Sequence, residues 1–144
     1  MKFITETLPN GLEIIAEVNP SAVSTAVGFF VKTGSRDESP EVSGVSHFLE
    51  HMVFKGTDKR SALDITYQLG ELGAQANAYT SIEQTVFYGA VLPENALAFT
   101  ELLGDMLMPA LAQEEYDMEK KVILEEIALY EDRPMHILFE GLMN

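Results

Sequence analysis

The spacing of hydrophobic and polar residues predicts five strands and four helices. Alternating or β-branched runs indicate strands, and apolar positions three or four residues apart indicate helices. The expected strands cover residues 3–8, 12–18, 23–32, 74–81 and 84–92, and the expected helices cover 43–55, 61–73, 93–108 and 114–132. This order predicts an α+β fold, with a mostly antiparallel sheet packed against helices.

Turn and cap residues place several of these boundaries. Asn10-Gly11 is typical of a tight turn between the first two strands. Ser61 and Asp64 have the spacing of a capping box, and Gly56 is suited to end the preceding helix. The run at 23–32 is long, β-branched and aromatic, so we expect it to be a central strand.

The helix expected at 43–55 is apolar around most of its circumference, apart from one stripe. His47 and His51 are one turn apart, and Glu50 falls on the same side. A helix that is apolar nearly all round is buried, and burying these groups without partners is costly. A divalent metal would satisfy them, since two imidazoles suit zinc and a nearby carboxylate can act as base. The order H-x-x-E-H is the reverse of the H-E-x-x-H metalloprotease signature.

The motif also has an ordinary interpretation. It fixes only three positions, and His and Glu are common on solvated helix faces. The large apolar neighbours favour a site, and two of the three His of the chain lie in the motif. The remaining one, His136, has no supporting pattern, so we expect it to be a surface or packing residue.

Composition narrows the class of protein. The chain has 144 residues, of which 47% are hydrophobic, and this predicts one folded domain. A formal charge of −14 argues against nucleic-acid binding, and no apolar run reaches membrane-spanning length. Because the chain has no Cys, a zinc site must use His and carboxylate ligands. The N-terminus has no secretion signal, so we expect a cytoplasmic protein that does not bind membranes.

The last expected helix supplies a candidate third ligand. Its apolar stripe consists of Tyr116, Ile123, Ile127 and Tyr130, with Val122 at the margin, and its opposite face consists of Asp117, Lys121, Glu125 and Asp132. Glu119 and Glu126 project within the apolar stripe. Since a buried carboxylate needs a partner, we predict Glu126 as the third metal ligand and Glu119 as a group that supports the ligands or the transition state. If the helix is rotated instead, both are surface charges.

Several segments resemble one family of metallopeptidases, along nearly the whole chain. They are Leu8–Leu12, Gly34–Glu38, Gly44–Thr57, Asn77–Ser81, Glu83–Thr85 and Glu119–Glu126. On these segments the chain resembles the pitrilysin, insulin-degrading enzyme and mitochondrial processing peptidase family, the inverzincins, and its processing-peptidase branch in particular. The family's third zinc ligand is a Glu about 75 residues after the second His, and Glu126 fits that position.

The resemblance implies a role for each residue of the site. His47, His51 and Glu126 would bind Zn2+, and Glu50 would be the general base for a zinc-activated water. Glu119 would be the family's additional helix carboxylate, catalytically important without binding the metal. The implied activity is that of a zinc-dependent endopeptidase that hydrolyses peptides or presequences.

The resemblance also implies how the substrate is bound. The strand that carries Asn77, Ala78 and Tyr79 would be the edge to which a peptide or protein substrate adds as a further strand. Alternation alone favours an ordinary strand at this place.

The architecture of the family extends beyond this chain. Its members are built from repeated domains that form two halves of a clamshell, and the second half supplies an Arg and a Tyr that hold the substrate. The resemblance therefore implies that residues 1–144 are the N-terminal part of a zinc-binding peptidase domain. The expected partner is the C-terminal half or a homologous subunit, in a dimer. We expect the chain alone to bind metal but to have weak or no peptidase activity.

Two other functions remain open at this point. One is a non-catalytic subunit of the family, which would bind peptide or scaffold a complex. Such subunits typically lose motif residues, whereas this chain has all four: His47, Glu50, His51 and Glu126. A structural metal site would need a fourth protein ligand, and the sequence offers no candidate for it.

Overall fold

The computed structural model describes residues 2–131, 135, 138 and 142. Its strands are β1 (Lys2–Thr7), β2 (Glu13–Val18), β3 (Thr25–Val31), β4 (Gln75–Thr80) and β5 (Thr85–Val91), and its helices are α1 (Val45–Met52), α2 (Ala62–Glu71), α3 (Ala96–Met106) and α4 (Gln113–Glu131). Short 3₁₀ helices lie at Ser35–Asp37, Pro40–Val42 and Pro93–Asn95. All strand pairings between these elements are antiparallel, and the predicted α+β fold is confirmed.

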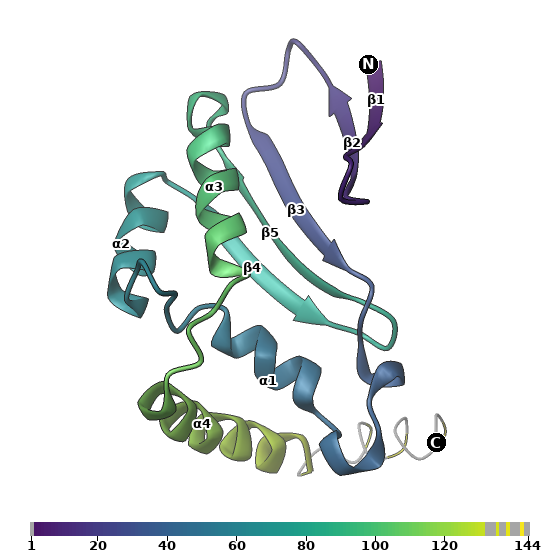
Figure 1. Cartoon of the computed structure of the whole chain (residues 1–144), viewed down its shortest axis with the longest axis vertical. Coiled ribbons are helices and arrows are strands. Elements are labelled where there is room, and N and C mark those ends of the chain that lie inside the picture. The colour runs from purple at the N-terminus through teal and green to yellow at the C-terminus, as the bar shows by residue number, and fades with distance from the viewer. Residues whose placement is uncertain (1, 132–134, 136–137, 139–141, 143–144) are drawn as a thin grey trace.

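The described strands form a separate hairpin and a three-stranded sheet (Figure 1). The hairpin joins β1 to β2 through the predicted turn, where Gly11 has a φ of +87°. The sheet has the order β3–β5–β4, so the prediction that residues 23–32 form a central strand is wrong. β5 is central because it pairs with both β3 and β4, and it is buried along most of its length. β3 exposes alternate residues and leaves Phe30 68% exposed. An apolar run indicates a strand but does not determine its neighbours.

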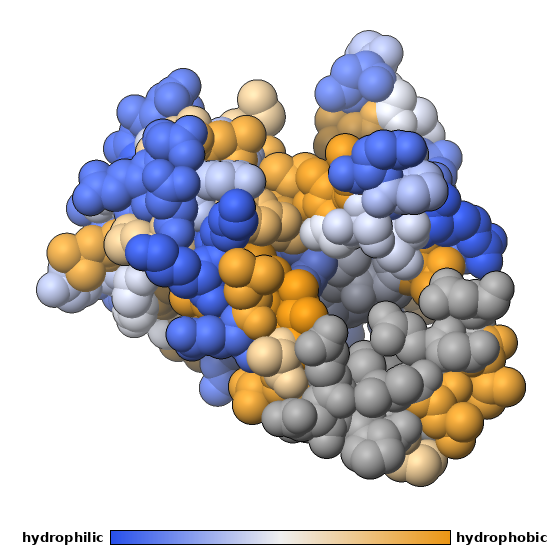
Figure 2. Space-filling view, turned by 90° about the horizontal axis from the view of Figure 1, so that it is seen from below, coloured by the Kyte–Doolittle hydropathy of each residue, from blue (hydrophilic) through white to orange (hydrophobic). Residues whose placement is uncertain are grey.

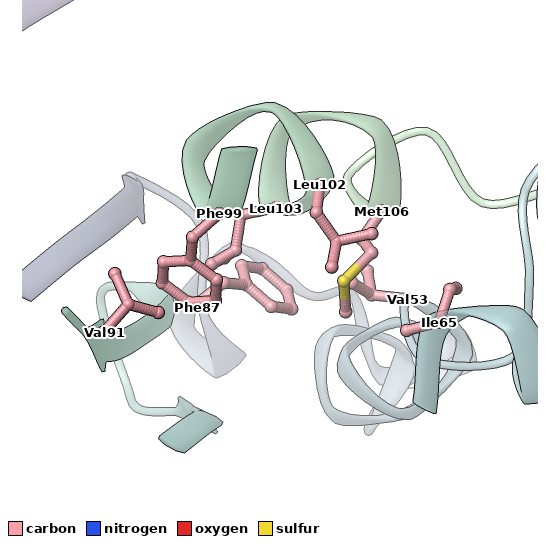
Figure 3. Packing of buried hydrophobic residues seen from close by; sticks show 8 residues of the cluster. All are labelled: Val53, Ile65, Phe87, Val91, Phe99, Leu102, Leu103 and Met106. Carbon is pink, nitrogen blue, oxygen red and sulfur yellow. The ribbon is translucent and has the colours of Figure 1, made fainter. Parts of the chain in front are cut away.

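Helix α3 lies across the sheet and forms the core with it (Figure 3). The cluster consists of Phe99, Leu102, Leu103 and Met106 from α3, Phe87 and Val91 from β5, Val53 after α1, and Ile65 from α2. Gly89 of β5 allows Phe99 to approach the sheet, because a Cβ at this position would lie 2.5 Å from the Cζ of the ring. The segment after α1 is therefore anchored to the same core as the sheet.

Helix α1 is shorter than predicted at both ends, since it covers Val45–Met52 and not 43–55. At its start, Glu38 accepts hydrogen bonds from the N–H groups of Gly44 at 2.6 Å and Ser46 at 2.8 Å. Burial raises the pKa of Glu38, but these bonds outweigh it and the pKa is lowered overall. After the last helical residue the chain makes a tighter turn, in which the Lys55 N–H donates to the Met52 carbonyl.

Helix α1 is also less buried than its apolar sequence predicts. Met52 is 1% exposed, but Val45 and Leu49 are 39% and 43% exposed. The helix lies between β4 and α4 and contacts both (Figure 1), but these elements leave Val45 and Leu49 partly uncovered. Its polar stripe faces these two elements, and this is what brings their side chains to the motif.

A polar network connects the loop after α1 to the last turn of α3 and to the segment that follows α3. Asp105 accepts hydrogen bonds from Thr57 Oγ1 at 2.8 Å and from Arg60 Nη1 at 2.5 Å. The Ala110 N–H donates to the Gly56 carbonyl at 3.0 Å. Burial raises the pKa of Asp105, but its hydrogen bonds lower it overall, so the carboxylate stays ionised. These contacts join the loop after α1 to α3 and to the segment that leads into α4.

Helix α4 has the predicted rotation about its axis. Glu119 and Ile123 are 4% and 7% exposed and face the interior, whereas Lys121 and Glu125 are exposed. The rotated alternative is therefore wrong. Three predicted positions lie outside the described side chains: Tyr130, Asp132 and His136.

The outer surface of α4 is more hydrophobic than a solvated face. Ile127, predicted in the buried stripe, is 47% exposed, and Val122 and Leu124 are 49% and 56% exposed. Tyr116, predicted in the same stripe, is 41% exposed, but its ring lies 4.8 Å from that of Phe48 on α1. The lower face of the molecule accordingly mixes hydrophobic with hydrophilic residues (Figure 2). Within the described chain, no helix combines the length and the hydropathy needed to cross a membrane.

Candidate metal centre

His47 and His51 lie one turn apart on α1 and face each other. Their Nε2 atoms are 3.1 Å apart, and the ring planes are nearly perpendicular, at 85°. The two side chains are 37% and 23% exposed. The pair is therefore open to solvent on one side, as a site for a metal and a substrate requires.

Helix α4 brings Glu126 to this pair. Its Oε2 lies 3.7 Å from His51 Nε2 and 4.0 Å from His47 Nε2, and one donor atom of each residue lies within 4.8 Å of the others. Tetrahedral zinc with bonds of about 2.1 Å separates its ligand atoms by about 3.4 Å. The three side chains thus fit zinc after small adjustments. Two imidazoles and one carboxylate are the donor set of catalytic zinc sites that keep a position open.

Glu119 contacts His51 on its other side. Its Oε1 lies 2.8 Å from His51 Nδ1, and its Oε2 lies 2.5 Å from Lys55 Nζ. Burial raises the pKa of Glu119, but Lys55 and then His51 outweigh it, and the pKa is lowered overall. Because an ionised carboxylate only accepts hydrogen bonds, His51 Nδ1 is the donor to Glu119, and Nε2 is the ring nitrogen that faces His47 and Glu126.

Glu50 precedes His51 but points toward β4. Its Oε2 accepts a hydrogen bond from Thr80 Oγ1 at 2.5 Å. Among the described residues it is not part of the group of potential ligands, which consists of His47, His51 and Glu126. Glu50 and His51 line the same cleft, so Glu50 lies next to this group without belonging to it.

A cleft runs beside the site, between α1, β4 and α4. Its lining residues are Glu50, His51, Phe54, Lys55, Asn77, Ala78 and Glu119. Two of the predicted substrate-binding residues, Asn77 and Ala78, thus lie at the cleft. Tyr79 does not line it, and its ring instead lies 6.1 Å from that of Tyr88 on β5. In the described sheet β4 is an edge strand, so its outer side can accept a further strand.

Sequence reasoning missed two side chains that contact the site. Thr80 donates to Glu50, and Lys55 pairs with Glu119. Both lie in segments that resemble the metallopeptidase family, but neither has a periodic pattern that indicates a partner. The contacts of Thr80 with Glu50 and of Lys55 with Glu119 are seen only in the folded structure.

Comparison with known proteins identifies relatives over almost the whole chain. Residues 13–144 match the family described as insulinase, peptidase family M16. An uncharacterized zinc protease of Bacillus subtilis is 45% identical over 135 residues, which cover 93% of this chain and 33% of that protein. A probable mitochondrial-processing peptidase subunit beta of Arabidopsis thaliana is 40% identical over 137 residues, which cover 94% of this chain and 26% of that protein.

A solved structure has the same fold. A protease from Helicobacter pylori matches with a TM-score of 0.89 and 28% identity, over 96% of this chain and 34% of that one. The chain spans about a third or less of the length of the relatives described here.

Proposed function

Because the chain belongs to the insulinase family, peptidase family M16, we propose that it carries the metal centre and the general base of a zinc-dependent endopeptidase. The convergence of His47, His51 and Glu126, with donor atoms within 4.8 Å of one another, supports this most directly. Glu50 lies beside them in the cleft. The proposed substrates are extended peptides or presequences.

Zn2+ is the expected cofactor, since relatives of this chain are named zinc proteases. We assign His47 and His51 as ligands through Nε2 and Glu126 as a ligand through its carboxylate, which leaves one position of a tetrahedral site open. Zinc in such a site polarises a carbonyl and lowers the pKa of water. Glu119 retains the Nδ1 proton of His51, and so keeps Nε2 available to the metal.

Glu50 is the proposed general base. It accepts a proton from the water that attacks the scissile carbonyl, and it delivers that proton to the leaving amine. The hydrogen bond from Thr80 occupies Oε2, so Oε1 can receive the proton. A fixed carboxylate suits both steps because it is oriented before the reaction begins.

The proposed substrate site is the outer edge of β4. A peptide that adds there forms backbone hydrogen bonds with the segment that contains Asn77, Ala78 and Tyr79. Side chains on alternate residues of the peptide then face the cleft or face away from it. The added strand passes close to Glu50, because both Glu50 and Ala78 line the same cleft.

The activity of the whole protein is a proposal as well, because the chain covers only 33% and 26% of the two relatives described above. We propose that residues 1–144 work with a C-terminal half or a homologous subunit, in a dimer that encloses the substrate. The chain alone is then expected to bind zinc and to show weak or no peptidase activity.

The zinc content of the purified chain tests the metal centre. We expect about one zinc per chain in the parent, and loss of zinc in the variants His47→Ala and Glu126→Gln. Glu125→Gln is the matched control, since Glu125 is an exposed carboxylate on the same helix. Zinc bound equally by all variants, or absent from the parent, would contradict the assignment.

A further inference from the structure

Lys55 makes a contact that the mechanism above does not use. Its Nζ lies 2.5 Å from Glu119 Oε2, while the other oxygen of the same carboxylate lies 2.8 Å from His51 Nδ1. The two contacts use different oxygens, so Glu119 can hold both partners at once. Lys55, Glu119 and His51 thus form a continuous chain of contacts that leads to a proposed metal ligand.

The position of Glu119 explains why it needs a cation. The residue is 4% exposed, and an ionised carboxylate at such a place is costly without a compensating charge. Its partners among the described ion pairs are Lys55 and His51. A neutral His51 gives a hydrogen bond but no charge, so the permanent charge comes from Lys55.

The backbone places Lys55 for this contact. It lies in the tight turn after α1, where its N–H bonds to the Met52 carbonyl, and Gly56 follows with a φ of +118°. The Lys55 side chain is 31% exposed and lines the cleft together with Glu119. This turn thus places the Lys55 ammonium beside Oε2 of Glu119, the oxygen that does not contact His51.

We propose that Lys55 is a positioning residue of the metal centre, which acts through Glu119 to keep His51 in the orientation and tautomer that point Nε2 toward His47 and Glu126. This rests on the proposed function, because it takes His51 to be a zinc ligand. The alternative is that Lys55 only joins the end of α1 to α4 and stabilises the fold.

Zinc affinity, measured by competition with a chelator, separates these two roles. We expect Lys55→Met to weaken zinc binding by about 10- to 100-fold, as changes to groups that orient metal ligands typically do. Lys55→Arg keeps the charge and is expected to stay close to the parent. Lys59→Met is the matched control, because Lys59 pairs with Asp105 at 3.3 Å and is 76% exposed. Equal affinity of Lys55→Met and the parent would overturn the proposal.

A double-mutant cycle tests whether Lys55 acts through Glu119. In the background of Glu119→Gln, Lys55→Met is expected to cause little further loss of zinc affinity, since the carboxylate that Lys55 holds is gone. A loss of the same size in both backgrounds would show that Lys55 acts by another route. If Lys55→Met does not fold, Lys55→Gln carries the same test, because it removes the charge and keeps a hydrogen-bond donor.

A measurement on the metal-free chain keeps this proposal separate from the zinc assignment. NMR of the ring nitrogens should show His51 protonated at Nδ1 in the parent, with an Nε2-protonated fraction in Lys55→Met. The thermal unfolding of both chains is recorded alongside it. If Lys55→Met unfolds at a lower temperature than the parent but has the same His51 tautomer, Lys55 has only a structural role, and the proposal is overturned. If the parent binds no zinc, the proposed function fails, while the tautomer still reports on Lys55.

Discussion

Thr80 donates a hydrogen bond to Glu50 across 2.5 Å, from the proposed substrate-binding strand to the proposed general base. Thr80 is the last residue of β4, and Glu50 lies on α1. The bond restricts the carboxylate to one orientation, so the same strand that would bind the peptide also holds the base. Correct placement of the base thus depends on the packing of α1 against β4.

Thr80→Val should lower peptidase turnover in the full-length protein that contains this chain. The variant keeps the shape of the side chain and removes the donor to Glu50. One hydrogen bond to a charged group corresponds to a loss of about tenfold. Thr80→Ser restores the hydroxyl and should recover most of the activity. Equal turnover of Thr80→Val and the parent would show that Glu50 does not need this bond.

Glu50→Gln should leave zinc bound and lower turnover by about 10²- to 10⁴-fold. The amide cannot accept the proton of the attacking water, and general bases contribute about 10²- to 10⁴-fold. The measurements are zinc content and cleavage of an extended peptide by the full-length protein. Activity retained by Glu50→Gln would remove Glu50 from this role. A full-length parent that binds zinc but cleaves no peptide would favour the non-catalytic subunit.

Asp105→Asn should reduce the free energy of unfolding at neutral pH by about 2 kcal/mol, because the bonds from Thr57 and Arg60 lose their charged acceptor. The folded-state pKa of Asp105 lies below its ordinary value of 3.8. Its stabilisation is therefore complete above pH 3.8 and is lost as the pH falls from there through the folded-state pKa. Parent and variant should converge in urea unfolding at low pH.

Glu101→Gln is the control for this comparison. Glu101 is an exposed carboxylate on the same helix, α3, so its variant should follow the parent across the pH range. An Asp105→Asn difference that stays constant down to the lowest pH would mean that the charge of Asp105 contributes no stability.

Gly89→Ala should destabilise the core by about 1–3 kcal/mol, the usual cost of overpacking. The added Cβ would lie 2.5 Å from Phe99 Cζ and 2.8 Å from the Gln75 carbonyl oxygen, and the backbone oxygen cannot easily move. Gly70→Ala is the matched control. Nothing lies within 4 Å of a Cβ at Gly70 in α2, so this variant should stabilise the helix by up to about 1 kcal/mol. Both are measured by thermal unfolding, and a stabilising Gly89→Ala would contradict the close packing of Phe99.

The sequence alone determined the features that depend on local geometry. The spacing of His47 and His51 places both on one side of any α-helix, and they do face each other across 3.1 Å. The capping box of Ser61 and Asp64 forms as predicted, with Asp64 N–H donating to Ser61 Oγ at 3.2 Å. The helical period of α4 likewise places Glu126 on the same face as Glu119, because residues seven apart share a face of a helix. Both side chains face His51 on α1.

The tertiary structure decided the features that depend on the path of the chain. The central position of β5 follows from its pairing with both β3 and β4, which a hydrophobic run in β3 cannot reveal. The contacts of Thr80 with Glu50 and of His51 with Glu119 join residues 30 and 68 positions apart. No local period links such positions, since their meeting depends on how α1 packs against β4 and α4. The sequence thus supplied the ligand types and their phase, and the fold supplied the partners that orient them.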